Sequence, residues 1–118
     1  MSTLIERVMI MNKVILLGRL TRDPECKIDT EDSSKSYARY TLAVNRKVKN
    51  GENEADFISC VAFGKSAEFV NGYLKQGVKI VITGRLQTGS YMKEDQKVYT
   101  TDVVVEEHEF AESKKESE

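Results

Sequence analysis

The residues best suited to chemistry are aromatic and cationic side chains close together near the middle of the sequence. Phe57 and Phe63 are six residues apart, and Lys65 follows directly. In an extended strand both rings point to the same face, about 20 Å apart. Aromatic rings of this kind stack on nucleic-acid bases while nearby cations hold the phosphates. The pattern indicates a surface for single-stranded nucleic acid, although composition alone would place both rings in a hydrophobic core.

The sequence offers few residues for catalysis or metal binding. It has one histidine, His108, and its two cysteines, Cys26 and Cys60, form no CxxC pair. A metal site needs several converging histidine, cysteine or carboxylate ligands, and a catalytic thiol needs a base beside it. We therefore expect two free thiols, no metal or other cofactor, and a binding protein rather than an enzyme.

Length and charge describe a single, mildly basic domain. The chain has 118 residues, of which 40% are hydrophobic and 31% charged, as in ordinary globular proteins. No apolar run approaches the roughly 20 residues that span a bilayer, and the first residues do not resemble a signal peptide. We therefore expect a cytoplasmic protein without a membrane partner.

The net charge of −1 conceals an asymmetry along the chain. Residues 1–105 hold 16 Lys and Arg against 13 Asp and Glu and are mildly basic, whereas residues 106–118 hold 2 against 6.

Hydrophobic patterns predict five strands and one helix that would position these residues. The expected strands are residues 12–20, 37–48, 56–63, 79–86 and 98–105. Ser66 is predicted to cap the helix, and Gly77 lies where a helix commonly stops. We expect a loop at residues 26–36 and hairpin turns at Asn50-Gly51 and residues 93–97.

The order of these elements favours an all-β fold, namely a five-stranded Greek-key barrel of the OB type with one short α-helix between strands three and four. Gly18 and Gly84 inside strands are typical of bulges, barrel corners or close backbone approaches. A five-stranded sandwich that does not close is the rival architecture. Tyr40 and Tyr73 are expected in the core, and His108 on the surface beyond the last strand.

Longer blocks of sequence also occur in a defined order between residues 11 and 110. They are MNKVILLGRLTRDPE, YTLAVNR, EADFISCVAFGKSAE, YLKQG, GRLQTGSY and VYTTDVVVE. Together they resemble the bacterial single-stranded DNA-binding proteins of the SSB family. Several blocks in one order over about a hundred residues are far more specific than any one short motif.

The resemblance implies a homotetramer of OB folds that binds and protects single-stranded DNA in replication, recombination and repair. It implies that Phe57, Phe63 and Tyr91 stack on bases, while Val48 takes the place of a further family aromatic. Phosphate contacts are expected from Lys13, Arg46, Lys47, Lys49, Lys65, Lys75 and Arg85. For Lys75 and Arg85, a solvated role without DNA stays equally open. The alternative function is an OB-fold primosome accessory or an RNA-binding protein.

The resemblance also divides the chain. Residues 1–10 form an N-terminal extension, residues 11–111 the OB domain, and residues 112–118 an acidic tail that we expect to be disordered. Many family members continue into an acidic tip ending in Pro-Phe that recruits replication and repair proteins. Such proteins are candidate partners here, but the tip is absent from this sequence. Whether the sequence is a short natural form or part of a longer chain stays open.

Overall fold

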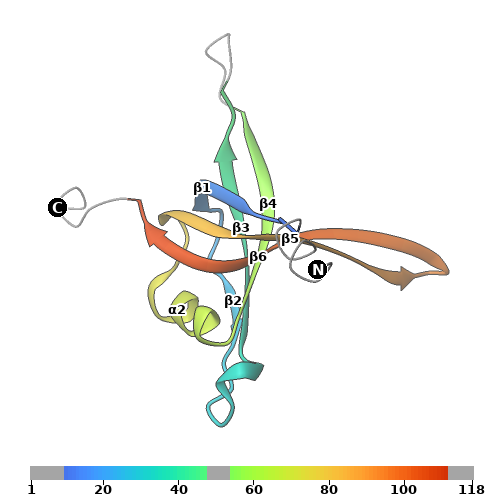
Figure 1. Ribbon diagram of the computed structural model, residues 1–118, viewed down its shortest axis with the longest axis horizontal. Helices are drawn as coiled ribbons and strands as arrows, with labels where there is room; N and C mark the ends of the chain where they lie inside the picture. The colour runs from blue at the N-terminus through green and yellow to red at the C-terminus, as the bar shows by residue number, and fades with distance from the viewer. Residues whose placement is uncertain (1–9, 48–53, 112–118) are drawn as a thin grey trace, which may run out of the picture.

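The computed structural model describes residues 10–47 and 54–111, and Figure 1 shows their arrangement. The elements in chain order are β1 (Val14–Leu20), β2 (Glu25–Lys27), the 3-10 helix η1 (Ser33–Lys35), β3 (Tyr37–Asn45), β4 (Ala55–Phe63), α2 (Lys65–Tyr73), β5 (Lys79–Lys93) and β6 (Gln96–Phe110). Within the described ranges, the helices are too short and too polar to cross a membrane. Residues 1–9 of the predicted extension, the tail and the Asn50-Gly51 turn lie outside these ranges.

The strands form one sheet that closes into a ring. The strand order is β1-β5-β6-β4-β3-β2, and β1 also pairs with β3. Five strands therefore follow one another around the ring, while β2 adds to the edge of β3. β4 and β6 run parallel, and the other pairs are antiparallel. The predicted all-β OB fold is confirmed, and the second pairing of β1 excludes the open sandwich.

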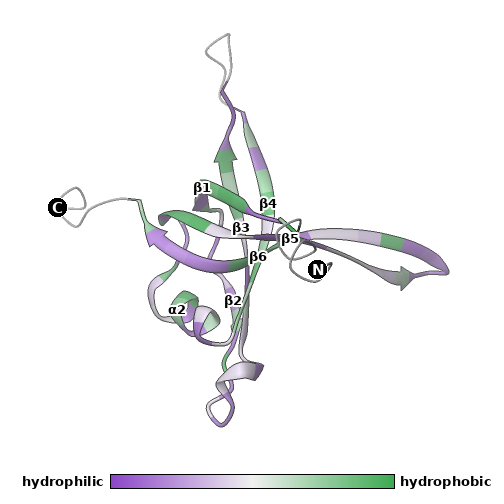
Figure 2. Ribbon diagram, viewed as in Figure 1, coloured by the Kyte–Doolittle hydropathy of each residue, from purple (hydrophilic) through white to green (hydrophobic). Residues whose placement is uncertain are grey.

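Side chains that point into the ring form the core. Along β3, Ala38, Tyr40 and Leu42 are buried, whereas the residues between them are more exposed, as expected for a strand with one face in the core. The core also includes Ile80 and Ile82 of β5. In Figure 2, hydrophobic segments gather on the strands around the ring and on α2, whereas the tip of the β5–β6 hairpin is hydrophilic. The core assignment of Tyr40 is confirmed.

β5 and β6 continue well beyond the predicted strands and form a long hairpin that projects from the ring (Figure 1). Their pairing extends from Ile80 opposite Phe110 to Lys93 opposite Gln96. The two turn residues, Glu94 and Asp95, have positive φ angles of 50° and 65°, as a tight hairpin turn requires. The sequence prediction ended these strands where hydrophobicity ended, but backbone pairing continues through polar residues.

Two further predictions about local structure were wrong. The expected loop at residues 26–36 contains β2, which pairs with β3. It also contains η1, which is capped by the Asp32 side chain, because this carboxylate accepts a hydrogen bond from the Ser34 backbone N–H. Helix α2 begins at Lys65 with Gly64 as its N-cap, so Ser66 lies inside the helix. The helix also ends at Tyr73, before Gly77.

Helix α2 packs against the ring through an aromatic cluster that reverses two expectations. His108 is partly buried; its Nε2 lies 2.8 Å from the Tyr40 hydroxyl, and its ring stacks on Phe69 with centroids 5.2 Å apart. Tyr73 is 66% exposed, and its ring packs against that of Phe69, four residues earlier, with centroids 5.0 Å apart. The buried side of the helix is occupied by Ala67 and Val70. His108 is therefore not a surface residue, and Tyr73 is not a core residue.

The ring leaves no room for a side chain at Gly84. A Cβ there would collide with the Val104 carbonyl oxygen, whereas Gly72 in α2 has open space around it. We expect Gly84→Ala to lower the free energy of unfolding by about 1–3 kcal/mol or more, because overpacking forces the backbone to shift. Gly72→Ala should raise it by about 0.5–1 kcal/mol, because alanine favours a helix. Urea denaturation of both variants measures this, and equal effects would contradict the close approach.

Burial lowers the pKa of His108 from its ordinary value of 6.5 to about 4. Between these values the unfolded chain binds a proton that the folded chain does not, so stability must fall as the pH falls. We expect a loss of about 1–2 kcal/mol between pH 7 and pH 5, a value discounted because the ring keeps some solvent contact. His108→Gln, which retains a hydrogen-bonding side chain but cannot titrate, should lose less. Urea midpoints at both pH values compare the proteins, and identical pH dependence would contradict the assignment.

Candidate nucleic-acid interface

The two phenylalanines lie on the outer face of β4. Phe57 is 70% exposed and Phe63 is 51% exposed, whereas Cys60 and Ala62, which alternate with them, are buried in the core. The period of two along β4 therefore places both phenylalanine side chains on the solvent side of the closed sheet, as the sequence pattern predicted. This exposure excludes a core role for these two side chains.

Strand pairing adds two arginines to the same face. Val61 of β4 is the register partner of Arg39 on β3 and of Val104 on β6, and Val104 is in turn the partner of Arg85 on β5. Residues opposite each other on paired strands project to the same face. Arg85 and Arg39 therefore lie on the outer face with Phe57 and Phe63. Of these two arginines, only Arg85 was predicted.

Arg39 carries its own counter-ion on this face. Its Nη1 lies 3.3 Å from the Asp102 carboxylate of β6 and 3.4 Å from the Ser59 hydroxyl of β4. The side chain therefore crosses β4 to reach β6. Because the Arg39 side chain is 51% exposed and the Asp102 side chain 22% exposed, the ion pair is open to solvent and to competing anions. Asp102 reduces the positive charge of the face at its centre.

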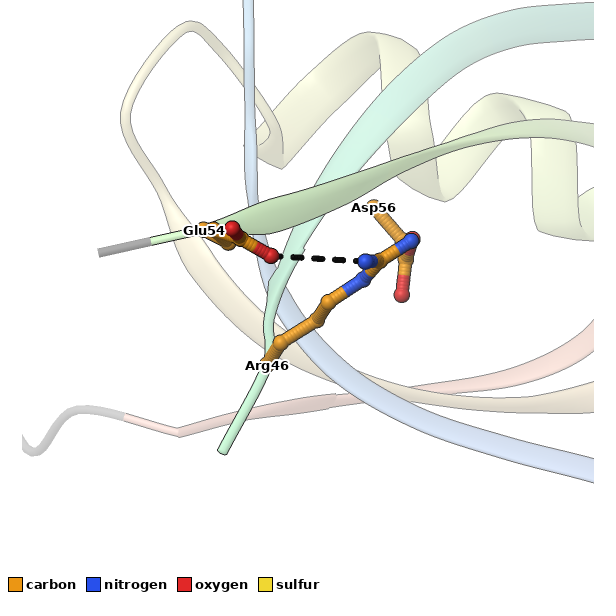
Figure 3. Close-up of polar contacts among 3 residues, drawn as sticks. All are labelled: Arg46, Glu54 and Asp56. Carbon is orange, nitrogen blue, oxygen red and sulfur yellow. Dashed lines mark hydrogen bonds and ion pairs between the residues drawn. The ribbon is translucent and has the colours of Figure 1, made fainter. Parts of the chain in front are cut away.

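Arg46, a predicted phosphate contact, is also held by carboxylates. Its Nε and Nη2 donate to the Asp56 carboxylate at 2.9 and 2.6 Å, and its Nη1 lies 3.4 Å from Glu54. Figure 3 shows Arg46 reaching from β3 between these two acids. The hydrogen bonds and charge of Arg46 hold the pKa of the Asp56 carboxyl below its ordinary value. The cluster joins the end of β3 to the start of β4. A phosphate that bound Arg46 would have to compete with both acids.

The other predicted basic residues lie at different distances from the aromatic face. Lys65 is exposed two residues after Phe63, in the first turn of α2, where the helix dipole also favours anions. Lys47 is exposed just beyond β3, whereas Lys49 lies outside the described residues. Lys13 makes an ion pair with Glu106 at 3.4 Å. Lys75 is exposed beyond the end of α2, remote in sequence from Phe63.

Tyr91 lies apart from the two phenylalanines. It is 51% exposed and pairs with Val98 on the β5–β6 hairpin. Figure 1 shows that this hairpin and the β3–β4 hairpin leave the ring in different directions. Phe57 and Phe63 thus share the outer face of β4, whereas Tyr91 lies on the separate β5–β6 hairpin. Val48, at the position of the missing family aromatic, lies outside the described residues.

Sequence reasoning missed Tyr37 and Arg39 as members of this face. They alternate with the buried Ala38 and Tyr40 on β3, and Tyr37 is the register partner of Phe63. The signal was present in the strand pattern. Once Tyr40 is assigned to the core, Tyr37 and Arg39 must point outward.

A closed OB ring with exposed aromatic and cationic residues on its outer strands defines the class of protein as an OB-fold nucleic-acid-binding module. Among the residues whose positions are described, no group of three His, Cys, Asp or Glu side chains converges to hold a metal ion. The chain belongs to the single-strand binding protein family, whose model matches residues 11–111.

Individual relatives agree with this family membership. The chain is similar to the single-stranded DNA-binding protein of Clostridium perfringens, with 50% identity over 104 residues, covering 87% of this chain and 67% of the relative. It is 46% identical over 110 residues to single-stranded DNA-binding protein 1 of Clostridium acetobutylicum, covering 91% of this chain and 99% of the relative.

A solved structure has the same fold. It is described as a Plasmodium falciparum SSB complex with ssDNA, and it superimposes with a TM-score of 0.77 at 21% sequence identity, covering 87% of this chain and 96% of that chain. At this low identity the similarity concerns the fold, which agrees with the closed ring described above.

The ion pair between Arg39 and Asp102 makes a prediction about charge on the outer face. Asp102→Asn removes one negative charge and releases Arg39 toward phosphates. We expect tighter binding of oligo-dT and a slope of log affinity against log salt that is steeper by up to about 0.7, the value for one added single-strand phosphate contact. Fluorescence anisotropy titrations at several salt concentrations measure both quantities.

Glu109→Gln provides the matched control, because it removes the same charge seven residues along β6, about 23 Å away in an extended strand. It should change the slope little. Equal effects of the two substitutions would show that only net charge matters and would contradict a specific role for Arg39.

Proposed function

We propose that the outer face of this OB fold binds single-stranded DNA without sequence preference, by stacking bases on Phe57 and Phe63 and by holding phosphates with neighbouring basic residues. The observation that carries this proposal is the exposure of both rings on one face of β4. Large aromatic rings are normally buried, so two of them on the solvent side of one strand indicate a partner with flat apolar surfaces. Unstacked bases have such surfaces.

Tyr91 supplies a third stacking position on the β5–β6 hairpin. Because this hairpin projects away from the ring (Figure 1), a strand of DNA that reaches both Tyr91 and Phe57 must follow a long path over the protein. The phosphates along this path meet Lys65 near Phe63 and Arg85 on β5. Lys47 and Lys49 would act near the β3–β4 hairpin, while Arg46, Lys13 and Lys75 are weaker candidates because of their ion pairs or position.

The protein coats and protects single-stranded DNA during replication, recombination and repair, and it catalyses no reaction, as is general in the single-strand binding protein family. The binding unit is a homotetramer. An apolar surface suited to assembly is present on β1, where Ile15 and Leu17 are exposed. We place the protein in the cytoplasm at the nucleoid, where its DNA substrate arises.

Stacking and phosphate contacts separate in one experiment. Phe57→Ala, Phe63→Ala and Tyr91→Ala should each weaken binding to oligo-dT by about 1–3 kcal/mol and leave the salt slope nearly unchanged, because stacking releases no counterions. Lys65→Ala should weaken binding mainly at low salt and reduce the slope by about 0.7. Anisotropy titrations over a range of salt concentrations distinguish the two classes.

Tyr73→Ala is the control for the loss of an exposed ring, because Tyr73 lies on α2 away from the outer face of β4. It should bind as the wild type does. Thermal unfolding of each variant checks that binding losses do not arise from misfolding. Normal binding by all three aromatic variants would contradict the proposal, and tighter binding to oligo-rU than to oligo-dT would favour the RNA-binding alternative.

A further inference from the structure

A row of three outward side chains, one of which is Phe63, crosses the sheet. Phe63 on β4 is the register partner of Tyr37 on β3, and Tyr37 is the partner of Lys27 on β2. Partners in antiparallel strands project to the same face with Cβ atoms about 4.5–5.5 Å apart. Tyr37 therefore lies directly beside Phe63, and Lys27 lies directly beside Tyr37.

Packing among the described residues does not account for the exposed ring of Tyr37. Its side chain is 42% exposed although it lies in the middle of a three-strand segment. Tyr73, another exposed tyrosine, has an internal partner because its ring packs against Phe69 at 5.0 Å. Among the described residues, no comparable ring contact involves Tyr37. Its ring thus presents a free apolar surface next to that of Phe63.

Two lysines lie beside this position. Lys27, Lys35 and Tyr37 line an open depression of about 440 Å³. The acids Asp29 and Glu31 lie on the same depression, but the Asp29 carboxylate accepts hydrogen bonds from the backbone N–H groups of Glu31 and Asp32. The local charge is therefore mixed, and the adjacent aromatic rings carry the argument.

We propose that Tyr37 is an additional stacking platform, on which the base next to the one on Phe63 rests, with Lys27 and Lys35 beside its phosphates. The DNA path then continues past Phe63 across β3 to β2, instead of ending at β4. This inference rests on the proposed function, because it extends the same binding face. It assigns β2 and η1, which the sequence pattern predicted as a loop, to the border of the DNA site.

The sequence makes a direct test available because it contains no tryptophan. Tyr37→Trp places a single tryptophan at the proposed platform, and Tyr73→Trp places one on α2 as the matched control. Saturation with oligo-dT at low salt should strongly quench the fluorescence of the Tyr37→Trp protein, because the indole stacks on a base, and should leave that of the Tyr73→Trp protein nearly unchanged. Equal responses of the two proteins would overturn the inference.

Affinity provides the second readout. Tyr37→Ala should weaken binding to oligo-dT by about 5-fold to 150-fold, the equivalent of one lost stacked base. Tyr37→Phe, which keeps the ring and loses the hydroxyl, should bind within about 2-fold of the wild type if stacking is the main interaction. Thermal unfolding verifies that each variant is folded, and the tryptophan measurement still tests the platform if Tyr37→Ala is not.

Parallel measurements on Phe57→Ala and Phe63→Ala separate this inference from the proposed function. If these two variants lose affinity while Tyr37→Ala binds normally and Tyr37→Trp is not quenched, the DNA path ends at β4 and the Tyr37 platform is wrong. If none of the three alanine variants loses affinity, the proposed binding face itself is wrong. Loss in all three, with quenching at position 37, supports the extended path.

Discussion

The close approach of backbones around β1 and β5 is the constraint on which the rest of the structure depends. β1 pairs with β5 along its length and with β3 near its end. A Cβ at Gly18 would lie 2.6 Å from the Ala43 carbonyl oxygen, and one at Gly84 would collide with Val104 at the point where the β5–β6 register shifts. Closure therefore requires residues without side chains at both places. Where they run through the closed ring, its strands have one side in the core and one in solvent, and the residues of the proposed binding face lie on a rigid frame.

This division into two sides explains why much of the site could be predicted from sequence. The alternation of β4 in the sequence predicts that Phe57 and Phe63 lie together, opposite Cys60 and Ala62, and the exposure of these side chains confirms it. The two strand glycines likewise indicated a barrel. Such features are local, because a period of two or a glycine within a strand constrains the backbone wherever the strand is placed.

The features that were not predicted depend on partners distant in sequence. Nothing near His108 indicates that Phe69 and Tyr40 will cover its ring, and nothing near Arg39 indicates that Asp102 will neutralise it. β2 was missed for a related reason, since three residues with polar neighbours have no clear hydrophobic pattern and gain strand structure only by pairing with β3. Carboxylates on the proposed binding face also lower its net attraction for a polyanion, which would limit non-specific electrostatic binding and give stacking more weight.

Cys60 adds a property that concerns oxidative chemistry. It lies on β4 beneath the proposed binding face, with its side chain in the core. Burial, together with the negative charge of Asp102, raises the pKa of its thiol to about 12. Because the thiolate is the form that attacks disulfides and is oxidised by peroxides, this sulfur remains unreactive at neutral pH. The strand that carries the two phenylalanines therefore keeps its geometry under oxidising conditions that would modify an exposed thiol.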